Sequence, residues 1–105
     1  MSENRIEAFA CFRDFYPYYL GEHRNPICRR LHFLGTSLVI ITFALSAATG
    51  FWPGLVALPV AGYGPAWIGH FFFEHNRPAT FRHPLWSLAG DFRMYWELLA
   101  GKREF

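Results

Sequence analysis

Charged residues are absent from a continuous stretch of 43 residues, positions 31–73, which holds no Lys, Arg, Asp or Glu. A helix needs about 20 mostly apolar residues to cross a bilayer, and this stretch contains two such segments, about 33–52 and 54–73. The sequence TGFWPG, positions 49–54, separates them with turn-forming residues. A chain of 105 residues has too little other mass to cover both helices. The missing charge therefore predicts a membrane helical hairpin.

The sequence also lacks the patterns typical of a zinc site or disulfide, of nucleic-acid binding and of a signal peptide. The two cysteines, Cys11 and Cys28, have no CxxC spacing, so both are expected to be small buried or membrane-flanking residues rather than parts of a zinc site or disulfide. The ten basic residues form no block and the net charge is only +2, which argues against a nucleic-acid partner. The N-terminal segment MSENRIEAFACFRDFY has no early apolar run, so no signal peptide is predicted.

Helical patterns flank the hairpin and complete the predicted fold, an all-α membrane domain over residues 1–105. An N-terminal interfacial helix is expected over about 5–23, opened by a capping box of Asn4 and Glu7 and either kinked or restarted at Pro17. A second interfacial helix is expected over about 84–100, because its apolar residues recur at helical spacing and its charges lie off that face.

The first span has a clear start. Asn25 is a typical N-cap and Pro26 a typical first helical residue, so one helix is expected to run from Pro26 into the membrane. Arginines lie before the first span and after the second, whereas the connecting loop has none. These are Arg24, Arg29, Arg30, Arg77 and Arg82. The positive-inside rule then places both termini in the cytoplasm.

Three of the five histidines are brought to one place by this topology. His32 begins the first span and His70 ends the second, and these ends are neighbours in an antiparallel hairpin. His23, in the short turn before Asn25, can fold over the same end. Glu74 lies one helical turn after His70, on the same face. Since a carboxylate at membrane depth is costly without a partner, a cation is the simplest explanation for the group.

Each residue of this group also has a plainer interpretation. A single histidine near a membrane surface is more often a hydrogen-bonding residue than a ligand, and Glu74 could instead pair with Arg77 or Arg82. His75 points about 100° away from His70 on a helix, and His83 is expected to be a helix cap or a surface residue. Both are left outside the predicted site.

The number of histidines limits the metal chemistry. Membrane di-iron hydroxylases and desaturases use several HxxxH and HxxHH boxes, and this chain has no HxxxH. One ion with three protein ligands fits better. Three histidines, or two and a carboxylate, on one face of an octahedral ion form the arrangement of non-haem Fe(II) oxygenases, which leaves positions for substrate and dioxygen.

Two segments of the sequence, one before and one after the hairpin turn, resemble motifs of a known family. FYPYYLGEHRNPICRRLHFLGTSL and AGYGPAWIGHFFFEHNRPATF resemble the small membrane proteins of the yeast-type 2-hydroxy fatty acid dioxygenase family, over nearly the whole chain. The most specific matches are Tyr19, His23, Asn25 and His32 in the first segment, and Gly69, His70, Phe73, Glu74, Pro78 and Ala79 in the second. The compact length is similar to that of the bacterial branch.

The resemblance implies an enzyme of α-oxidation. Such enzymes are Fe(II)-dependent and use dioxygen to decarboxylate a long-chain 2-hydroxy fatty acid, which loses one carbon. It implies iron held by His23, His32 and His70. Tyr19, Asn25 and Glu74 belong to the implied catalytic set, with Glu74 either a fourth ligand or a group that orients one. It also implies a bacterial cytoplasmic membrane protein, in contact with membrane lipid.

Two arginines are candidates for the substrate carboxylate, Arg77 and Arg30, although both are equally well explained as residues that anchor the chain at the membrane surface. The acyl tail is expected along the second span, near Gly62 and Gly64. Two other functions stay open. One is a haem-binding electron carrier with His32 and His70 as axial ligands, and the other is a non-catalytic hairpin with a structural metal or none. The oligomeric state is open too, with a homo-oligomer as one alternative.

Overall fold

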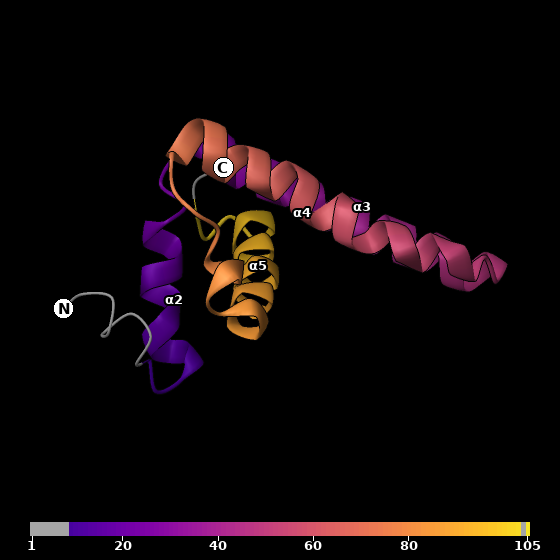
Figure 1. Ribbon diagram of the computed structural model, residues 1–105, viewed down its shortest axis with the longest axis horizontal. Helices are drawn as coiled ribbons and strands as arrows, with labels where there is room; N and C mark the ends of the chain where they lie inside the picture. The colour runs from indigo at the N-terminus through magenta and orange to yellow at the C-terminus, as the bar shows by residue number, and fades with distance from the viewer. Residues whose placement is uncertain (1–8, 104) are drawn as a thin grey trace.

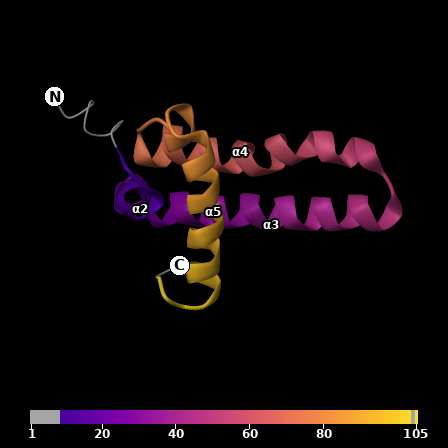
Figure 2. The same ribbon diagram turned by 90° about the horizontal axis from the view of Figure 1, so that it is seen from below.

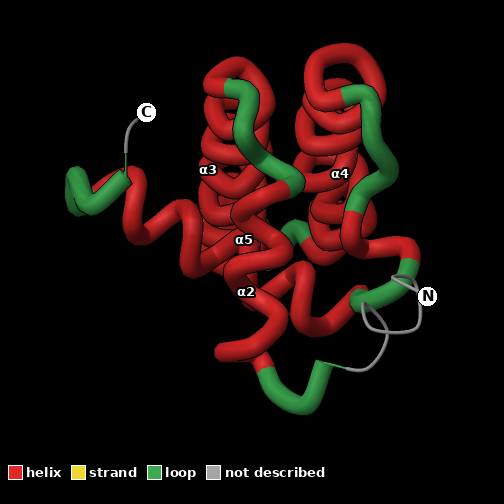
Figure 3. The backbone as a smooth tube through the Cα atoms, turned by 90° about the vertical axis from the view of Figure 1, so that its left-hand side faces the viewer, coloured by secondary structure: helices red, strands yellow, loops and turns green. Residues whose placement is uncertain are grey.

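The computed structural model describes residues 9–103 and 105. These residues form helices and no strand (Figure 3), which confirms the predicted all-α class. In chain order the elements are α2 (Phe12–Gly21), α3 (Pro26–Thr49), η1 (Trp52–Ala57), α4 (Leu58–Ile68), η2 (Gly69–Glu74), η3 (Ala79–Phe81) and α5 (Pro84–Leu99). The predicted capping box of Asn4 and Glu7 lies outside the described residues.

The hairpin is formed by α3 and the joined elements η1, α4 and η2. As predicted, α3 is one helix that starts at Pro26, and the side chain of Asn25 caps it by accepting a hydrogen bond from the backbone N–H of Ile27 at 2.8 Å. It ends at Thr49 and is followed by Gly50, whose φ of 71° favours glycine. The returning arm, Trp52–Glu74, runs antiparallel beside α3 (Figure 2).

Close packing of the two arms depends on small residues. A Cβ atom placed on Gly35 of α3 would lie 2.8 Å from the backbone oxygen of Gly62 in α4. A side chain at this crossing would therefore separate the helices, which is the general role of small residues between membrane helices.

Most of the hairpin surface is apolar and exposed. Both arms are long and apolar enough to cross a membrane, and only 22% of the most apolar window of α3 and 17% of that of the other arm are buried. The core helix of a soluble protein would be mostly buried. Exposed apolar side chains along the arms include Leu34, Leu38, Ile41, Phe43, Leu45, Val56 and Val60. This surface is suited to lipid.

Helices α2 and α5 lie at one end of the hairpin, the base, where the chain enters and leaves it, and the rest of the hairpin projects away (Figure 1). The molecule is accordingly elongated, 49 × 26 × 25 Å. The buried core lies at this base. It is formed by Phe15, Tyr16, Tyr19, Ala79, Met94 and Leu98. The hairpin itself therefore has little core of its own.

The predicted helix over 5–23 is wrong at residues 9–11, which are not helical; α2 begins at Phe12 and continues through Pro17 to Gly21. The physical reason is the packing of Phe9, whose ring lies 5.6 Å from that of Phe15 and 5.4 Å from that of Tyr18. Residues six and nine apart cannot meet in one continuous helix, since its rise is 1.5 Å per residue. The chain turns at Cys11 instead.

Helix α5 has two different faces. The buried face contains Ser87, Gly90, Met94, Glu97 and Leu98. The opposite face exposes an apolar stripe of Leu85, Leu88, Phe92, Trp96 and Leu99. Glu97 joins the helix to α2 by accepting a hydrogen bond from Tyr16 Oη at 2.5 Å. An exposed apolar stripe on a helix that crosses the hairpin base is typical of a helix lying in a membrane interface.

Candidate metal centre

Three histidines from three segments meet at the base of the hairpin. His23 lies in the turn after α2, His32 on α3 and His70 on η2, and all three are almost completely buried. The Nε2 atom of His23 lies 3.0 Å from Nε2 of His32 and 3.1 Å from Nε2 of His70. The structure thus brings together the three histidines that the hairpin topology placed at one membrane depth.

The other ring nitrogen of each histidine has an oxygen partner. Nδ1 of His23 donates to the carbonyl of Tyr19 at 2.7 Å, and Nδ1 of His32 donates to the carbonyl of Cys28 at 2.9 Å. Nδ1 of His70 donates to Oδ1 of Asn76 at 2.6 Å. Since a neutral imidazole carries one proton, all three Nε2 atoms are left as acceptors.

Three lone pairs therefore face one another with no proton between them. Burial and the neighbouring imidazoles hold the pKa of His23 well below its usual range, so its ring stays neutral. A metal cation removes the repulsion, and a partner on the second ring nitrogen is the usual arrangement for a metal-binding histidine. The cluster thus has the donor set and the orientation of a metal centre.

The nitrogen–nitrogen distances also bear on the kind of ion. For a metal–nitrogen distance of about 2.1 Å, neighbouring ligands lie about 3.0 Å apart around an octahedral ion and about 3.4 Å apart around a tetrahedral one. The observed distances from His23 Nε2, 3.0 Å to His32 and 3.1 Å to His70, fit neighbouring positions around an octahedral ion. Three histidine ligands leave the remaining positions of such an ion for other ligands.

The segment η2 is a π-helix, and it ends at His75, whose φ of 60° lies in the left-handed region. After this left-handed residue the chain folds back, and the side chain of Asn76 comes within hydrogen-bonding distance of the His70 ring. The amide of Asn76 also donates to the carbonyl of Glu22 at 3.2 Å, which connects η2 to the segment holding His23. His75 itself is exposed and lies outside the cluster, as expected.

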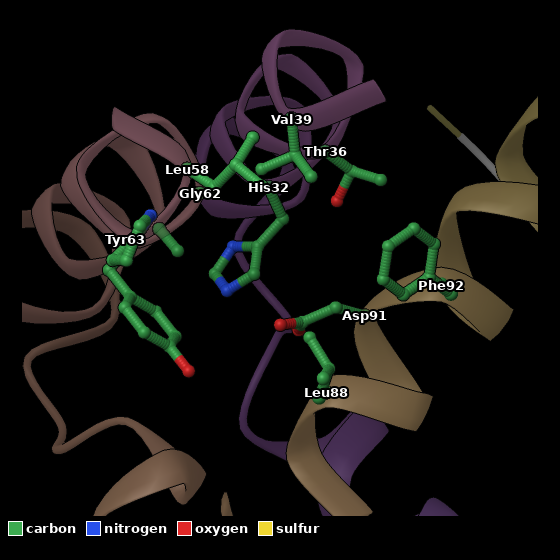
Figure 4. Close-up of a pocket in the computed structure, with 11 residues that line it drawn as sticks. His32, Thr36, Val39, Leu58, Gly62, Tyr63, Leu88, Asp91 and Phe92 are labelled. Carbon is green, nitrogen blue, oxygen red and sulfur yellow. The ribbon is translucent and has the colours of Figure 1, made fainter. Parts of the chain in front are cut away.

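A cavity of about 350 Å³ opens next to the cluster (Figure 4). His32 forms one end of its lining, and the cavity continues along α3 through Thr36 and Val39 and along α4 through Gly62 to Leu58. Leu88 and Phe92 of α5 line the facing side. Most of the lining is apolar, so the cavity suits a hydrocarbon chain whose polar end reaches the histidines.

One comparison with known proteins identifies the family. Residues 9–103 match the family described as 2-hydroxy-palmitic acid dioxygenase Mpo1-like. The chain belongs to this family. The resemblance noted from the histidine motifs is thereby confirmed, and the family's name points to dioxygenase activity. No curated protein and no solved structure matches the chain.

Within this Mpo1-like chain, Glu74 and Asn25 lie beside the cluster. Glu74 Oε2 accepts a hydrogen bond from the backbone N–H of Asn25, and the side-chain amide of Asn25 reaches the carbonyl of Phe73 at 3.4 Å. These contacts fasten the end of η2 to the start of α3. Glu74 is not among the residues whose ligand atoms converge, so its position favours a role in orienting the ligands.

Cys28 is the fourth residue of the converging group. Its Sγ lies within 4.8 Å of the histidine ligand atoms and 3.7 Å from Nδ1 of His32. The sequence predicts Cys28 as a small buried or membrane-flanking residue outside any metal site; it is buried, but it lies in the converging group. The signal was present: Cys28 and His32 are four residues apart, and so share a helix face.

The two arginines proposed for the substrate carboxylate are not brought to the cavity. Arg30 is exposed, lies over the ring of Phe105 at 5.5 Å, and donates to the Phe105 backbone oxygen at 3.4 Å. Arg77 is also exposed, and neither residue lines the cavity. His83 is expected from the sequence to be a helix cap or a surface residue. It is half-buried and precedes α5, but its side chain makes no capping hydrogen bond.

Tyr19 and Asp91 connect α2 and α5 next to the site. The ring of Tyr19 stacks on His23 with centroids 4.1 Å apart, and its hydroxyl donates to Oδ1 of Asp91. Burial raises the pKa of Asp91 to about 7, although the bond from Tyr19 opposes this shift. Asp91 was missed in the sequence because it looks like one more charge on the polar face of an amphipathic helix.

Proposed function

We propose that this chain is an Fe(II)-dependent dioxygenase of 2-hydroxy fatty acids, which converts each to carbon dioxide and a fatty acid one carbon shorter. The single observation that carries the proposal is the set of three buried Nε2 atoms, oriented by oxygen partners on Nδ1 and spaced 3.0 and 3.1 Å apart. Membership of the Mpo1-like family supports the same reaction. The substrates are a long-chain 2-hydroxy acid and dioxygen, and the products balance as the shorter acid, carbon dioxide and water.

In this proposal His23, His32 and His70 hold the metal and Asn76 fixes the ring of His70. Bound Fe(II) would supply the redox chemistry that dioxygen needs. The apolar cavity holds the acyl tail, and its mostly apolar lining on α3, α4 and α5 lets a lipid-dissolved substrate keep its far end in an apolar environment. The chain's own work is to orient the ligands, exclude water from the tail site and align the acid with the metal.

The proposal includes a location for the protein. The hairpin spans a membrane, the base with α2 and α5 lies at its cytoplasmic surface, and both termini are cytoplasmic. The arginines that flank the hairpin support this orientation. A bacterial cytoplasmic membrane is the proposed setting.

The experiment is metal analysis combined with turnover. Purified protein loaded anaerobically with Fe(II) should hold one iron per chain, show no Soret band, and convert 2-hydroxypalmitic acid to a product one carbon shorter only when dioxygen is admitted. His70→Ala should bind no iron and have no activity. His75→Asn is the matched control, because it changes an exposed histidine and keeps a residue tolerant of positive φ. Wild-type turnover in His70→Ala would contradict the proposal.

A haem carrier is disfavoured by the position of His23. Axial ligands from His32 and His70 would require a porphyrin between them, but His23 Nε2 already lies within 3.1 Å of both. A structural zinc hairpin is the remaining alternative, and the Cys28 thiol, a soft ligand, is the observation in its favour. Binding of zinc as tight as that of iron, with no oxygen-dependent turnover of the hydroxy acid, would support this alternative.

A further inference from the structure

Two polar groups beside the metal centre have no part in holding a metal, and they differ in hydrogen-bonding character. One is the carboxylate of Asp91 on α5, and the other is the indole N–H of Trp67 on α4. Both residues, together with His32 and His70, line a space of about 10 Å³ next to the histidines. A space of this size holds about one water molecule, so one oxygen atom of a ligand fits there, and the rest of the ligand's head lies in the adjoining cavity, which His32 and Asp91 also line.

Asp91 presents an acceptor to this space. Tyr19 donates to Oδ1 of Asp91, and the described residues provide no other hydrogen bond to this carboxylate. Figure 4 shows the Asp91 side chain pointing from α5 toward His32 and the interior of the cavity. The second oxygen, Oδ2, is therefore the atom that a ligand's hydroxyl can reach.

Trp67 presents a donor. Its Nε1–H is buried and has no hydrogen-bond partner among the described residues. The ring is held in place by stacking on Tyr63, with centroids 5.5 Å apart, and by an edge contact with Phe81 at 5.3 Å. An unpaired buried donor costs on the order of 1–3 kcal/mol, so its retention beside a metal centre indicates a ligand atom that completes it.

We propose that Asp91 and Trp67 recognise the polar head of the 2-hydroxy acid: Asp91 accepts a hydrogen bond from the 2-hydroxyl and Trp67 donates one to a carboxylate oxygen. This rests on the proposed function and names the residues that select its substrate. The assignment follows from charge: above pH 7, where Asp91 is ionised, two carboxylates repel each other in an apolar site, and the hydroxyl is the head's only donor. A plain fatty acid lacks that donor.

The tail site is continuous with this head site. His32, Tyr63, Ala66 and Asp91 line both the small space and the large apolar cavity. A ligand whose head lies between Asp91 and Trp67 therefore has its hydrocarbon chain directed along α3 and α4. The same two residues also explain why neither Arg30 nor Arg77 needs to reach the cavity.

The test uses metal-free protein, so that no metal contributes to binding. The full chain is placed in lipid nanodiscs, and binding of labelled 2-hydroxypalmitic acid and palmitic acid is measured against empty nanodiscs. The wild-type protein should prefer the hydroxy acid by on the order of tenfold, as expected for a hydrogen bond to a charged group. No preference in the wild type would overturn the proposal.

Asp91→Asn tests the hydroxyl contact with almost no change of shape. Its amide oxygen can still accept from Tyr19, and its amide nitrogen then replaces Oδ2 with a donor. The preference for the hydroxy acid should fall to less than about twofold, while palmitic acid binds at least as tightly as before, because the repulsion between the two carboxylates is removed. Asp14→Asn, an exposed residue of α2, is the matched control. An undiminished preference in Asp91→Asn would overturn the role of Asp91.

Trp67→Phe removes the donor and keeps an aromatic ring. Binding of both acids should weaken by a similar factor, roughly five- to tenfold, so that their ratio is unchanged. Trp96→Phe, on the exposed face of α5, should alter neither affinity. Unchanged binding in Trp67→Phe would overturn its role. These outcomes are separate from turnover: failure of the iron-loaded wild type to consume dioxygen would refute the reaction, whereas the binding ratios test the head contacts.

Discussion

At the scale of single residues, the site is determined less by the histidines than by the atoms that hold their Nδ1 positions. Two of the three partners are backbone carbonyls, of Tyr19 and Cys28, each four residues before its histidine. They follow from local helix geometry and cannot be removed by substitution. The third is the side chain of Asn76, which is the one replaceable support.

Asn76→Ala should therefore weaken metal binding without removing a ligand. Loss of a hydrogen bond to a metal-binding histidine typically lowers metal affinity 10–100-fold, and here the ring of His70 also becomes free to rotate. Competition with a metal indicator under anaerobic conditions measures the change. His75→Asn serves as the neighbouring control, and affinity equal to wild type in Asn76→Ala would show that His70 is oriented by other contacts.

A second prediction at this scale concerns Asp91 and pH. Its pKa is about 7 in the folded protein, against about 3.9 for an exposed carboxyl. Between these values the unfolded chain loses the proton first, so stability falls as pH rises from 4 to 7 and then levels off. Asp91→Asn has no such proton. The stability of Asp91→Asn relative to wild type should therefore rise between pH 5 and pH 8, by up to about 2.6 kcal/mol in free energy of unfolding, seen as a relative rise in thermal midpoint.

The comparison is made on metal-free protein in detergent, and it isolates Asp91 because both proteins contain the same histidines. His23 acts in the opposite sense, since its lowered pKa reduces stability as pH falls below about 6.5. That effect cancels in the difference. A constant difference between pH 5 and pH 8 would mean that the folded Asp91 titrates like an exposed carboxyl.

At the scale of elements, close approach of backbones brings the ligands together. A Cβ atom on Gly69 would lie 2.9 Å from Sγ and 3.1 Å from Cα of Cys28, so η2 touches α3 directly beside His70. A Cβ on Gly90 would lie 3.0 Å from the Tyr19 ring, so α5 approaches α2 in the same manner. Together with the contact of Gly35 with α4, three such contacts join five elements around the site: α2, α3, α4, η2 and α5.

Gly69→Ala should separate η2 from α3 and so displace His70. We expect a loss of metal affinity of at least about tenfold and a lower thermal midpoint, because the opposing atoms include backbone that cannot move aside. Gly64→Ala is the matched control on the same arm. A Cβ there meets nothing within 4 Å, so this variant should be neutral or stabilised by up to about 1 kcal/mol through helix propensity. Equal behaviour of the two variants would contradict the close-contact explanation.

These elements also show which features the sequence could predict. The cap at Asn25, the start of α3 at Pro26 and the meeting of His23, His32 and His70 follow from local chemistry and hairpin topology. The π-helix η2 and the turn at Cys11 depend on tertiary packing, of Gly69 on Cys28 and of Phe9 on Phe15. Asp91 and Trp67 are identified only once α5 is placed across the hairpin, and helical periodicity does not encode that placement.

At the scale of the whole molecule, the protein has two unequal ends. The base holds α2, α5, the metal centre and the flanking arginines, whereas the far end is the apolar turn around Gly50. The cavity lies between, and its lining runs from the histidines toward that turn. Under the proposed function, a lipid substrate would lie with its head at the base and its tail along this cavity.

This arrangement predicts that Cys11 and the hairpin turn lie on opposite sides of the membrane. Cys11 is exposed near the base, and Cys28 is buried and should not react. In bacterial cells with an intact inner membrane, a membrane-impermeant maleimide should label Cys11 only after the membrane is permeabilised. In a Cys11→Ser background, Thr49→Cys, at the exposed end of α3, should be labelled in spheroplasts without permeabilisation. Labelling of both positions from the same side would refute a spanning hairpin, because both arms would then fail to cross. Labelling of Cys11 without permeabilisation and of Thr49→Cys only after it would keep the hairpin but reverse its orientation. The metal centre would then lie at the outer face of the membrane.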